Sequence, residues 1–307
     1  MDRERESMDK KFKSGFCAII GMPNVGKSTL LNSIAGQKIA IISDKPQTTR
    51  NKILAIYSTD TEQIMFTDTP GIHNPHNKLG EYMVRMANES MRDTDVVLFV
   101  VDAQKGMREK EREIAENIGN IGIPCILVIN KVDLIKKENL LPLIADFSSL
   151  NDFEAIMPIS AKENDGIDRL IETITDYIEE GPMFYDEDMV TDQPEKAIAA
   201  EIIREKMLWL LDKEIPHGIA IEITRMKEKG KVTEINATIC CEKKSHKGII
   251  IGKNGEMLKK IGTMARADIE KMLEKKVYLE LWVKIKTDWR NSDFLIKNFG
   301  YRDDDEI

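Results

Sequence analysis

The hydrophobic positions of residues 15–180 fall into short continuous runs that are separated by segments with helical periodicity. Six runs predict strands, at 16–21, 53–57, 64–67, 96–102, 125–130 and 155–159. Helical patterns lie between most of them, at 27–35, 78–92, 108–120, 138–149 and 166–179. Uninterrupted apolar runs are typical of strands buried on both faces. The pattern therefore predicts an α/β domain with a six-stranded, mostly parallel sheet and helices on both faces.

The strands at 53–57 and 64–67 are too close for a crossover helix, so they are expected to pair as a hairpin. Residues 181–194 contain two prolines and four acidic residues with little periodicity, which indicates a linker. The elements after it follow the order α-β-β-α-α-β, with helices expected at 195–213, 245–251 and 256–275 and strands at 218–227, 231–241 and 277–286. We therefore predict a first domain at 14–180, the linker at 181–194, an α+β domain at 195–290 and a frayed tail at 291–307.

The net charge of −8 hides a strong asymmetry along the chain. Residues 243–290 contain 13 Lys and Arg residues against 6 Asp and Glu residues, which points to a site for a polyanion. The four cysteines show neither a disulfide framework nor zinc-ligand spacing. No run of 18 apolar residues and no signal-peptide pattern is present, so we expect a cytoplasmic protein.

Residues 21–28, Gly-Met-Pro-Asn-Val-Gly-Lys-Ser, match the phosphate-binding pattern G-x-x-x-x-G-K-[ST] between a strand and a helix. Such a loop wraps phosphates with backbone amides at a helix N-terminus. Lys27 is expected to contact the β- and γ-phosphates, and the Ser28 hydroxyl to bind Mg²⁺. The expected nucleotide-binding residues here are Gly21, Met22, Pro23, Asn24, Val25, Gly26, Lys27, Ser28 and Thr29.

Three more motifs follow the ends of later strands, where ligands bind in open α/β sheets. The first is Asp68-Thr69-Pro70-Gly71, in which Asp68 can hold Mg²⁺ through water and the Gly71 amide can bond the γ-phosphate. The second is 130–133, where the Asp133 carboxylate can accept bonds from N1–H and the 2-amino group of guanine, selecting GTP over ATP. In the third, at 160–162, the Ala161 amide is expected to reach guanine O6. These motifs add Asp68, Thr69, Pro70, Gly71, Ile72, Asn130, Lys131, Val132, Asp133, Ser160, Ala161 and Lys162 to the nucleotide-binding set.

Hydrolysis is expected to be slow, because Ile72 stands where Ras-like GTPases place a water-orienting Gln. The Asn24 carboxamide could instead hold a monovalent cation beside the phosphates; the alternative is an Asn tolerated in the turn. Thr48 or Thr49 is expected to bind Mg²⁺ from a switch segment at 44–50, and Thr49 is preferred; residues 72–80 would form a second switch. The expected metal ligands are thus Ser28, Thr49 and Asp68, and the expected catalytic residues are Lys27, Asn24, Thr49 and Gly71.

The basic second domain contains Gly252-Lys253-Asn254-Gly255 between two expected helices. A GXXG loop lets a nucleic-acid backbone approach closely, although a plain helix–helix turn has the same pattern. The expected RNA-binding residues are Gly252, Lys253, Asn254, Gly255, Lys247 and Lys259. Trp282 and Trp289 could stack on bases, but Trp282 is expected to pack in the core.

Taken together, the chain resembles the Era GTPases, which belong to the TrmE–Era–EngA group of translation-factor-class GTPases. The resemblance rests on 21–28, Pro-Gln-Thr-Thr-Arg at 46–50, 68–72, 130–133, 160–162, the helix at 199–206 and 249–255. It implies a P-loop GTPase domain followed by a type II KH domain, GTP hydrolysis that requires Mg²⁺, and potassium dependence through Asn24. It also implies binding near the 3′ end of 16S ribosomal RNA and a role in 30S subunit biogenesis.

Some members of this group associate loosely with membranes, so peripheral contact with the inner face of the cell membrane is a further implication. The excess of basic residues at 243–290 motivates the alternative hypothesis, a membrane-peripheral signalling GTPase that uses its basic domain on anionic lipid. A P-loop phosphotransferase is a third alternative, against which the guanine-reading motif argues. We expect a monomer.

Overall fold

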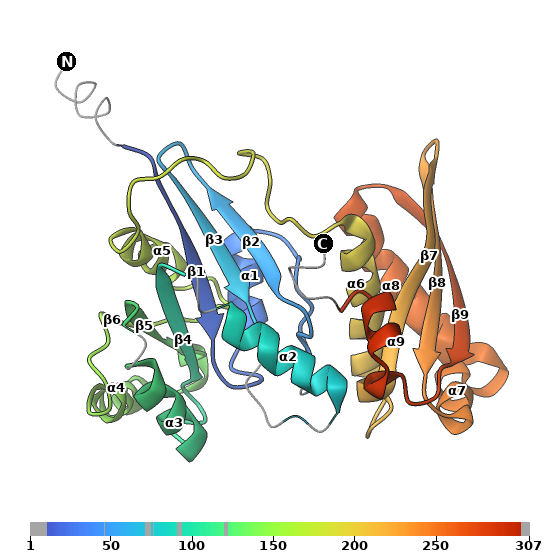
Figure 1. Cartoon of the computed structure of the whole chain (residues 1–307), viewed down its shortest axis with the longest axis horizontal. Coiled ribbons are helices and arrows are strands. Elements are labelled where there is room, and N and C mark those ends of the chain that lie inside the picture. Colours follow the sequence, from blue (N-terminus) through green and yellow to red (C-terminus); the bar gives the residue numbers. More distant parts are fainter. Residues whose placement is uncertain are drawn as a thin grey trace. The chain divides into compact units, whose positions relative to one another are not determined.

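The computed structural model describes residues 11–45, 47–70, 75, 77–90, 94–119 and 122–301 (Figure 1). The chain forms two compact units. The first comprises residues 1–39, 51–73 and 85–192, and the second comprises 40–50, 74–84 and 193–307. The predicted first and second domains account for most of these units, but the second unit also includes two segments from the N-terminal half of the sequence.

The first unit contains the predicted six-stranded sheet. Its spatial order is β2-β3-β1-β4-β5-β6, and its strands are β1 (Lys13–Ile20), β2 (Ile53–Ser58), β3 (Glu62–Asp68), β4 (Val96–Asp102), β5 (Cys125–Asn130) and β6 (Ala155–Pro158). The pair β2–β3 is antiparallel and the other pairs are parallel, which confirms the hairpin. β1 begins before the apolar run, because its polar end pairs with β3 through Lys13 and Glu62.

Helices alternate with these strands as α1 (Lys27–Ala35), α2 (Lys78–Glu89), α3 (Glu109–Ile118), α4 (Leu140–Ser148) and α5 (Ile167–Thr175). Every residue of β4 and β5 is buried, so both faces of the sheet centre are covered. On one face Phe99 contacts Phe147 of α4 edge-to-face, with ring centroids 6.2 Å apart. This layering places the carboxyl ends of the parallel strands at one edge of the sheet.

The second unit has the predicted α-β-β-α-α-β order: α6 (Glu195–Leu210), β7 (Ile219–Lys229), β8 (Val232–Cys241), α7 (Lys244–Ile251), α8 (Glu256–Leu273) and β9 (Lys276–Ile285). The sheet order is β7-β8-β9, with β7 antiparallel and β9 parallel to β8. Apolar side chains of α6 and α8 pack with one face of this sheet, and Ile202, Ile239 and Ile261 are 1 % exposed or less.

Two expectations for the second domain were wrong. The tail was expected to be frayed, but it contains α9 (Asp293–Asn298) and Trp289 is fully buried against Phe299 and Tyr301, with ring centroids 5.2 and 6.1 Å away. Residues 302–307 lie outside the described part of the chain. Trp282 was expected in the core but is 58 % exposed, because it stands on the face of β9 opposite the core residue Val283.

Within the described ranges, no helix combines the length and the apolar character that crossing a membrane requires.

Candidate nucleotide and RNA sites

The phosphate-binding loop connects the end of β1 to the start of α1. Gly21 has φ 147°, and a Cβ there would lie 2.3 Å from the carbonyl oxygen of Val100. Gly26 has φ 102°, and a Cβ there would lie 2.2 Å from Asn130 Nδ2. Both positions therefore require glycine, because a side chain would collide with the backbone or with the loop that follows β5.

Lys27 is held inside this loop and is only 7 % exposed. Its Nζ donates to the carbonyl oxygens of Gly21, at 3.2 Å, and Met22, at 3.3 Å. Burial lowers the pKa of the Lys27 ammonium, and the nearby Asp68 carboxylate raises it in part. A bound phosphate would stabilise the charged form far better than two carbonyl dipoles do, since it brings full negative charge.

The two expected Mg²⁺ ligands of this unit lie together. The Ser28 hydroxyl donates to Asp68 Oδ2 over 2.7 Å, and Asp68 is fully buried at the end of β3. A hydroxyl and a carboxylate are hard oxygen donors of the kind that Mg²⁺ prefers, so the residues present fit that ion. Thr69 donates to the carbonyl of Ile19 at 3.3 Å, which links the residue after β3 to β1. The expected contributions of Gly71 and Ile72 lie outside the described residues.

Asn130, at the end of β5, connects the phosphate-binding loop, the loop at 131–133 and the loop at 160–162. Its Nδ2 donates to the Val25 carbonyl at 2.9 Å. Its Oδ1 accepts the backbone N–H of Lys131 at 2.8 Å and of Ala161 at 3.0 Å. The Ala161 amide, which is expected to reach guanine O6, is thus held at the base-reading loop by the Asn130 side chain.

The base-reading loop is fixed by Ser160 and Lys131, which were expected at the nucleotide site, and by Asp102, which the motifs did not include. Ser160 Oγ donates to Asp133 Oδ1 over 2.6 Å, so the hydroxyl orients the carboxylate that would read guanine. Lys131 has φ 65°, and its Nζ contacts Asn24 O and Asp102 Oδ2, each at 2.7 Å. Asp102 is 3 % exposed at the end of β4. A buried acid at the carboxyl end of a central strand was the signal that could have identified it.

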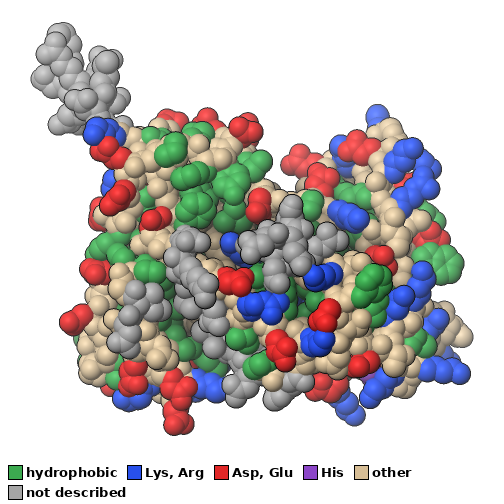
Figure 2. Space-filling model, in the orientation of Figure 1, with side chains coloured by type: hydrophobic (Ala, Val, Ile, Leu, Met, Phe, Trp, Pro, Cys, Tyr) green, Lys and Arg blue, Asp and Glu red, His purple; other side chains and the backbone are tan. Residues whose placement is uncertain are grey.

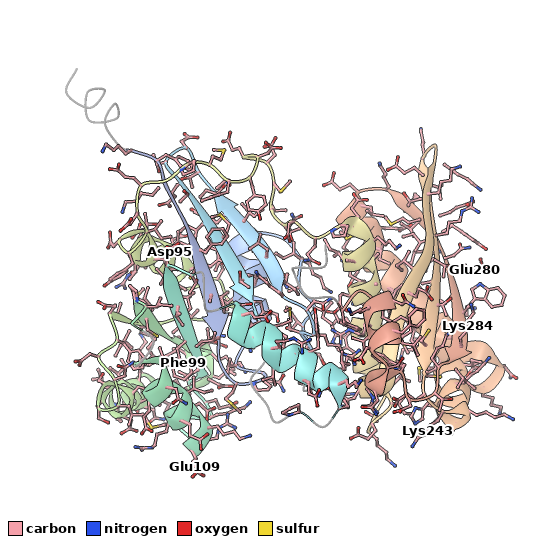
Figure 3. The ribbon with its side chains drawn as sticks, viewed as in Figure 1. Asp95, Phe99, Glu109, Lys243, Glu280 and Lys284 are labelled. Atoms are coloured by element: carbon pink, nitrogen blue, oxygen red, sulfur yellow. The ribbon has the colours of Figure 1, made fainter. Side chains whose placement is uncertain are left out.

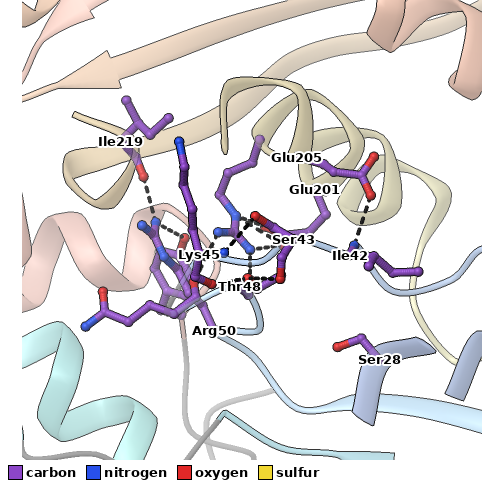
Figure 4. Close-up of polar contacts among 12 residues, drawn as sticks. Ser28, Ile42, Ser43, Lys45, Thr48, Arg50, Glu201, Glu205 and Ile219 are labelled. Atoms are coloured by element: carbon purple, nitrogen blue, oxygen red, sulfur yellow. Dashed lines mark hydrogen bonds and ion pairs between the residues drawn. The ribbon is translucent and has the colours of Figure 1, made fainter. Parts of the chain in front are cut away.

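The expected switch segment belongs to the second unit (Figure 4). Arg50 is 2 % exposed, and its guanidinium donates to the carbonyls of Ile219, at 2.6 Å, and His217, at 2.9 Å, and to the Tyr301 hydroxyl at 3.2 Å. It also lies over the Trp289 ring, 5.9 Å from the centroid. Burial lowers the pKa of Arg50, although an arginine remains charged at any physiological pH.

Helix α6 holds the rest of this segment. Arg204, which is 1 % exposed, donates to the carbonyls of Thr48 and Gln47 and forms an ion pair with Glu201 at 2.5 Å. In addition, Glu205 accepts the backbone N–H of Ile42 at 2.9 Å. Residues 40–50 are thus bonded to the second unit by buried charged groups, and sequence patterns did not single out Arg50 or Arg204 for this role.

The two threonines considered as Mg²⁺ ligands lie in the same segment. The Thr48 hydroxyl donates to the Lys45 carbonyl at 2.6 Å, so it is already engaged in a local turn. Thr49 is 8 % exposed. Both belong to the second unit, whereas Ser28 and Asp68 belong to the first.

The GXXG loop has the backbone that its sequence predicts. Gly252 has φ 74°, and a Cβ there would lie 2.7 Å from Met257 Cβ. Asn254 and Gly255 also have positive φ, of 52° and 80°, directly before α8. Lys253 and Asn254 are exposed at the tip, where they can meet a nucleic-acid backbone.

A groove of about 370 Å³ runs from this loop between α8 and β9. Apolar and basic side chains share its lining, which consists of Gly255, Leu258, Lys259, Gly262, Thr263, Arg266, Leu279 and Leu281. We call it the GXXG groove. Lys259 was expected at this site, whereas Arg266 and the two leucines of β9 were not, because their place in the groove depends on how α8 packs on the sheet. Figure 2 shows Lys and Arg side chains gathered along the β9 side of this unit.

Comparisons with known proteins agree with this arrangement. Residues 16–131 match the family described as 50S ribosome-binding GTPase, and residues 214–290 match the KH domain family. The chain is 56 % identical to GTPase Era of Ruminiclostridium cellulolyticum, over 95 % of this chain and 98 % of that protein. It is 52 % identical to GTPase Era of Clostridioides difficile, over 95 % and 99 % of the two chains.

Two solved structures are similar over nearly the whole chain. Both have a TM-score of 0.91 and 43 % identity, and they cover 94 % of this chain and 99 % of theirs. One is Aquifex aeolicus Era, in a variant form, bound to GDP·AlF4⁻. The other is Era in complex with MgGDPNP and nucleotides 1506–1542 of 16S ribosomal RNA.

Proposed function

Because the chain belongs to the GTPase Era family and is itself a GTPase, we propose that it is a switch that binds the 3′ region of 16S ribosomal RNA and assists 30S subunit biogenesis. One observation carries the proposal. The segment between α1 and β2, which is expected to respond to the γ-phosphate, is bonded through Arg50 and Arg204 to the unit that contains the GXXG groove. In this proposal the nucleotide and RNA sites therefore share this segment.

In this proposal the loops after the strands of the first unit hold the nucleotide. Lys27 contacts the β- and γ-phosphates, and Asp133 reads guanine with Ser160 orienting it. Mg²⁺, held by Ser28, Asp68 and Thr49, would neutralise charge on the phosphates when bound. MgGDPNP in the similar structure supports Mg²⁺ as the cofactor.

Nucleotide binding is coupled to RNA binding if Thr49 contacts Mg²⁺ only while the γ-phosphate is present. A ligand shifts an equilibrium only through different affinities for its two states. Any rearrangement of 44–50 that brings Thr49 to Mg²⁺ acts on the carbonyls held by Arg204, and so on the second unit. The RNA complex of the relative contains a GTP analogue. We therefore assign tighter RNA binding to the GTP-bound state.

The RNA partner can be tested in cells by crosslinking and sequencing with the wild-type chain and a variant of the GXXG loop. Reads concentrated near the 3′ end of small-subunit ribosomal RNA, and lost in the variant, are the expected result. Diffuse reads that the variant does not change would contradict the RNA assignment. The lipid alternative predicts instead that the protein floats with anionic liposomes after RNase treatment.

We further propose that the protein is cytoplasmic and that it is a monomer.

Potassium dependence is a separate prediction, and it concerns the side chain of Asn24. The backbone there has φ 65°, so an Asn is favourable in this turn whether or not it binds a cation. We expect hydrolysis in K⁺ to exceed that in Na⁺ about tenfold in the wild type, because a cation at the carboxamide would stabilise charge on the β–γ bridge. The measurement is phosphate release at equal ionic strength in the two salts.

The substitutions must respect that backbone. Asn24→Gly accepts positive φ and removes the carboxamide, so it should abolish the difference between the salts. Asn24→Asp accepts the same backbone and keeps an oxygen ligand, so it should retain the difference. Equal rates of the wild type in K⁺ and Na⁺ would refute the cation site.

A further inference from the structure

Strand β9 presents two large aromatic rings to solvent. Tyr278 is 59 % exposed and Trp282 is 58 % exposed, while Val277 and Val283 on the opposite face are part of the core. Side chains alternate along a strand, so Tyr278 and Trp282 share the face of the sheet that points away from this core. Large exposed apolar groups that gather on one face often mark an interaction site.

Polar groups stand between and beside these rings. Glu280 lies between them in the sequence of β9, and Figure 3 shows Glu280 and Lys284 projecting from the same side of the strand. The register places Glu234 of β8 beside Tyr278 and Asn236 beside Glu280, whereas Thr238 beside Trp282 is buried. On β7, Arg225 is the neighbour of Asn236. We call the side chains of Tyr278, Glu280, Trp282 and Lys284 the outer face.

This combination suits unpaired nucleotides. Aromatic rings stack on bases, lysines contact phosphates, and carboxylates accept from the amino groups of cytosine or adenine. Tyr278 and Trp282 are four residues apart, which separates them by about 13 Å along a strand. That spacing leaves room for Glu280 to face a base edge between two stacked bases. An anionic lipid surface offers phosphates to Lys284 but no planar base on which the two rings can stack.

The outer face is also continuous with the GXXG groove. Leu279 and Leu281, which alternate with the residues of the outer face, line the groove on the other side of β9. In the sheet order β7-β8-β9 of the described chain, β9 is an edge strand. An RNA strand that leaves the groove can therefore cross this edge and reach Trp282.

We propose that the outer face is a second RNA-binding surface, which takes unpaired nucleotides adjacent to those held in the GXXG groove. The proposal rests on the function proposed above. A GXXG groove clamps about four nucleotides, so a longer ribosomal RNA segment needs further contacts. Stacking on the two rings supplies them without demanding one fixed sequence.

The test compares two RNA probes on the full-length protein loaded with a GTP analogue. One probe is the 16S ribosomal RNA fragment 1506–1542; the other is an oligoribonucleotide of about four nucleotides from the same region, which fills the groove alone. We expect Trp282→Ala and Tyr278→Ala each to lower the affinity for the long probe about 5- to 100-fold. The affinity for the short probe should stay unchanged. Trp282→Phe should keep most of the affinity, because it keeps a ring.

The control is Phe294→Ala, which removes a 73 % exposed ring on α9 of the same unit and should change neither affinity. Equal affinity of Trp282→Ala and the wild type for the long probe would contradict RNA binding by the outer face, while leaving the assignment of the GXXG groove intact. Equal losses for both probes would also overturn it, since they would indicate damage to the groove through β9. If the wild type binds neither probe, the proposed function fails as well. Loss of self-association without loss of RNA affinity would assign the face to a second copy.

Discussion

Asp133→Asn should weaken GTP binding about 10²- to 10⁴-fold and create binding of XTP. A carboxylate that accepts from N1–H and the 2-amino group contributes two charge-assisted bonds of roughly 1.5–3 kcal/mol each. A carboxamide cannot accept both, and its NH₂ group opposes the 2-amino group of guanine. Xanthine has a carbonyl at that position, which the new NH₂ group can donate to. Fluorescent-nucleotide titration with GTP and XTP measures both changes.

The matched control is Ser160→Ala. In the wild type the Ser160 hydroxyl holds Asp133 Oδ1 at 2.6 Å, so its removal loosens the carboxylate without removing it. GTP affinity should fall about tenfold, with no gain of XTP binding, since one oriented hydrogen bond is lost. Retention of GTP affinity within about threefold in Asp133→Asn would show that another group reads the base.

Lys253→Asp/Asn254→Asp should lower RNA affinity at least 100-fold and leave GTP binding unchanged. The two carboxylates would stand at an exposed loop tip where the phosphate backbone approaches, so attraction becomes repulsion. Aspartate is chosen over alanine because Asn254 has φ 52°, which Asp tolerates better. The measurement is binding of 16S fragment 1506–1542 by fluorescence anisotropy, with nucleotide affinity measured on the same preparations.

Lys213→Asp provides the comparison for charge. Lys213 is exposed in the same unit and also has positive φ, of 56°. Its substitution lowers the net charge by two, against three for the double variant, at a similar backbone cost. It should lower RNA affinity less than threefold. A comparable loss in both variants would mean that overall charge, and not the GXXG loop, governs binding.

Much of the first unit could be predicted because its signals are local. Continuous apolar runs identify the buried strands, and the glycines of the phosphate-binding loop are demanded by close contacts with Val100 and Asn130. The short interval between β2 and β3 indicated a hairpin, and the pairing confirms it. These features depend on a few consecutive residues, so periodicity and spacing are sufficient.

The features that were missed depend on tertiary placement. Arg50 and Arg204 look like surface charges in the sequence, yet both are at most 2 % exposed, because carbonyls and Glu201 satisfy their guanidinium groups. Trp282 was expected in the core, although the alternation along β9 places it on the outer face. No local pattern reports which residues a loop such as 40–50 will contact.

If nucleotide state controls RNA affinity, as we propose, the GTP-bound and GDP-bound protein must differ in how tightly they bind the same RNA. The dissociation constant of 16S fragment 1506–1542 is determined for the wild type saturated with a non-hydrolysable GTP analogue and with GDP, both with Mg²⁺. We predict that the RNA binds at least about tenfold more tightly in the presence of the analogue. By linkage, bound RNA should raise the preference of the protein for the GTP analogue over GDP by the same factor. Equal affinities in the two nucleotide states would contradict the claim.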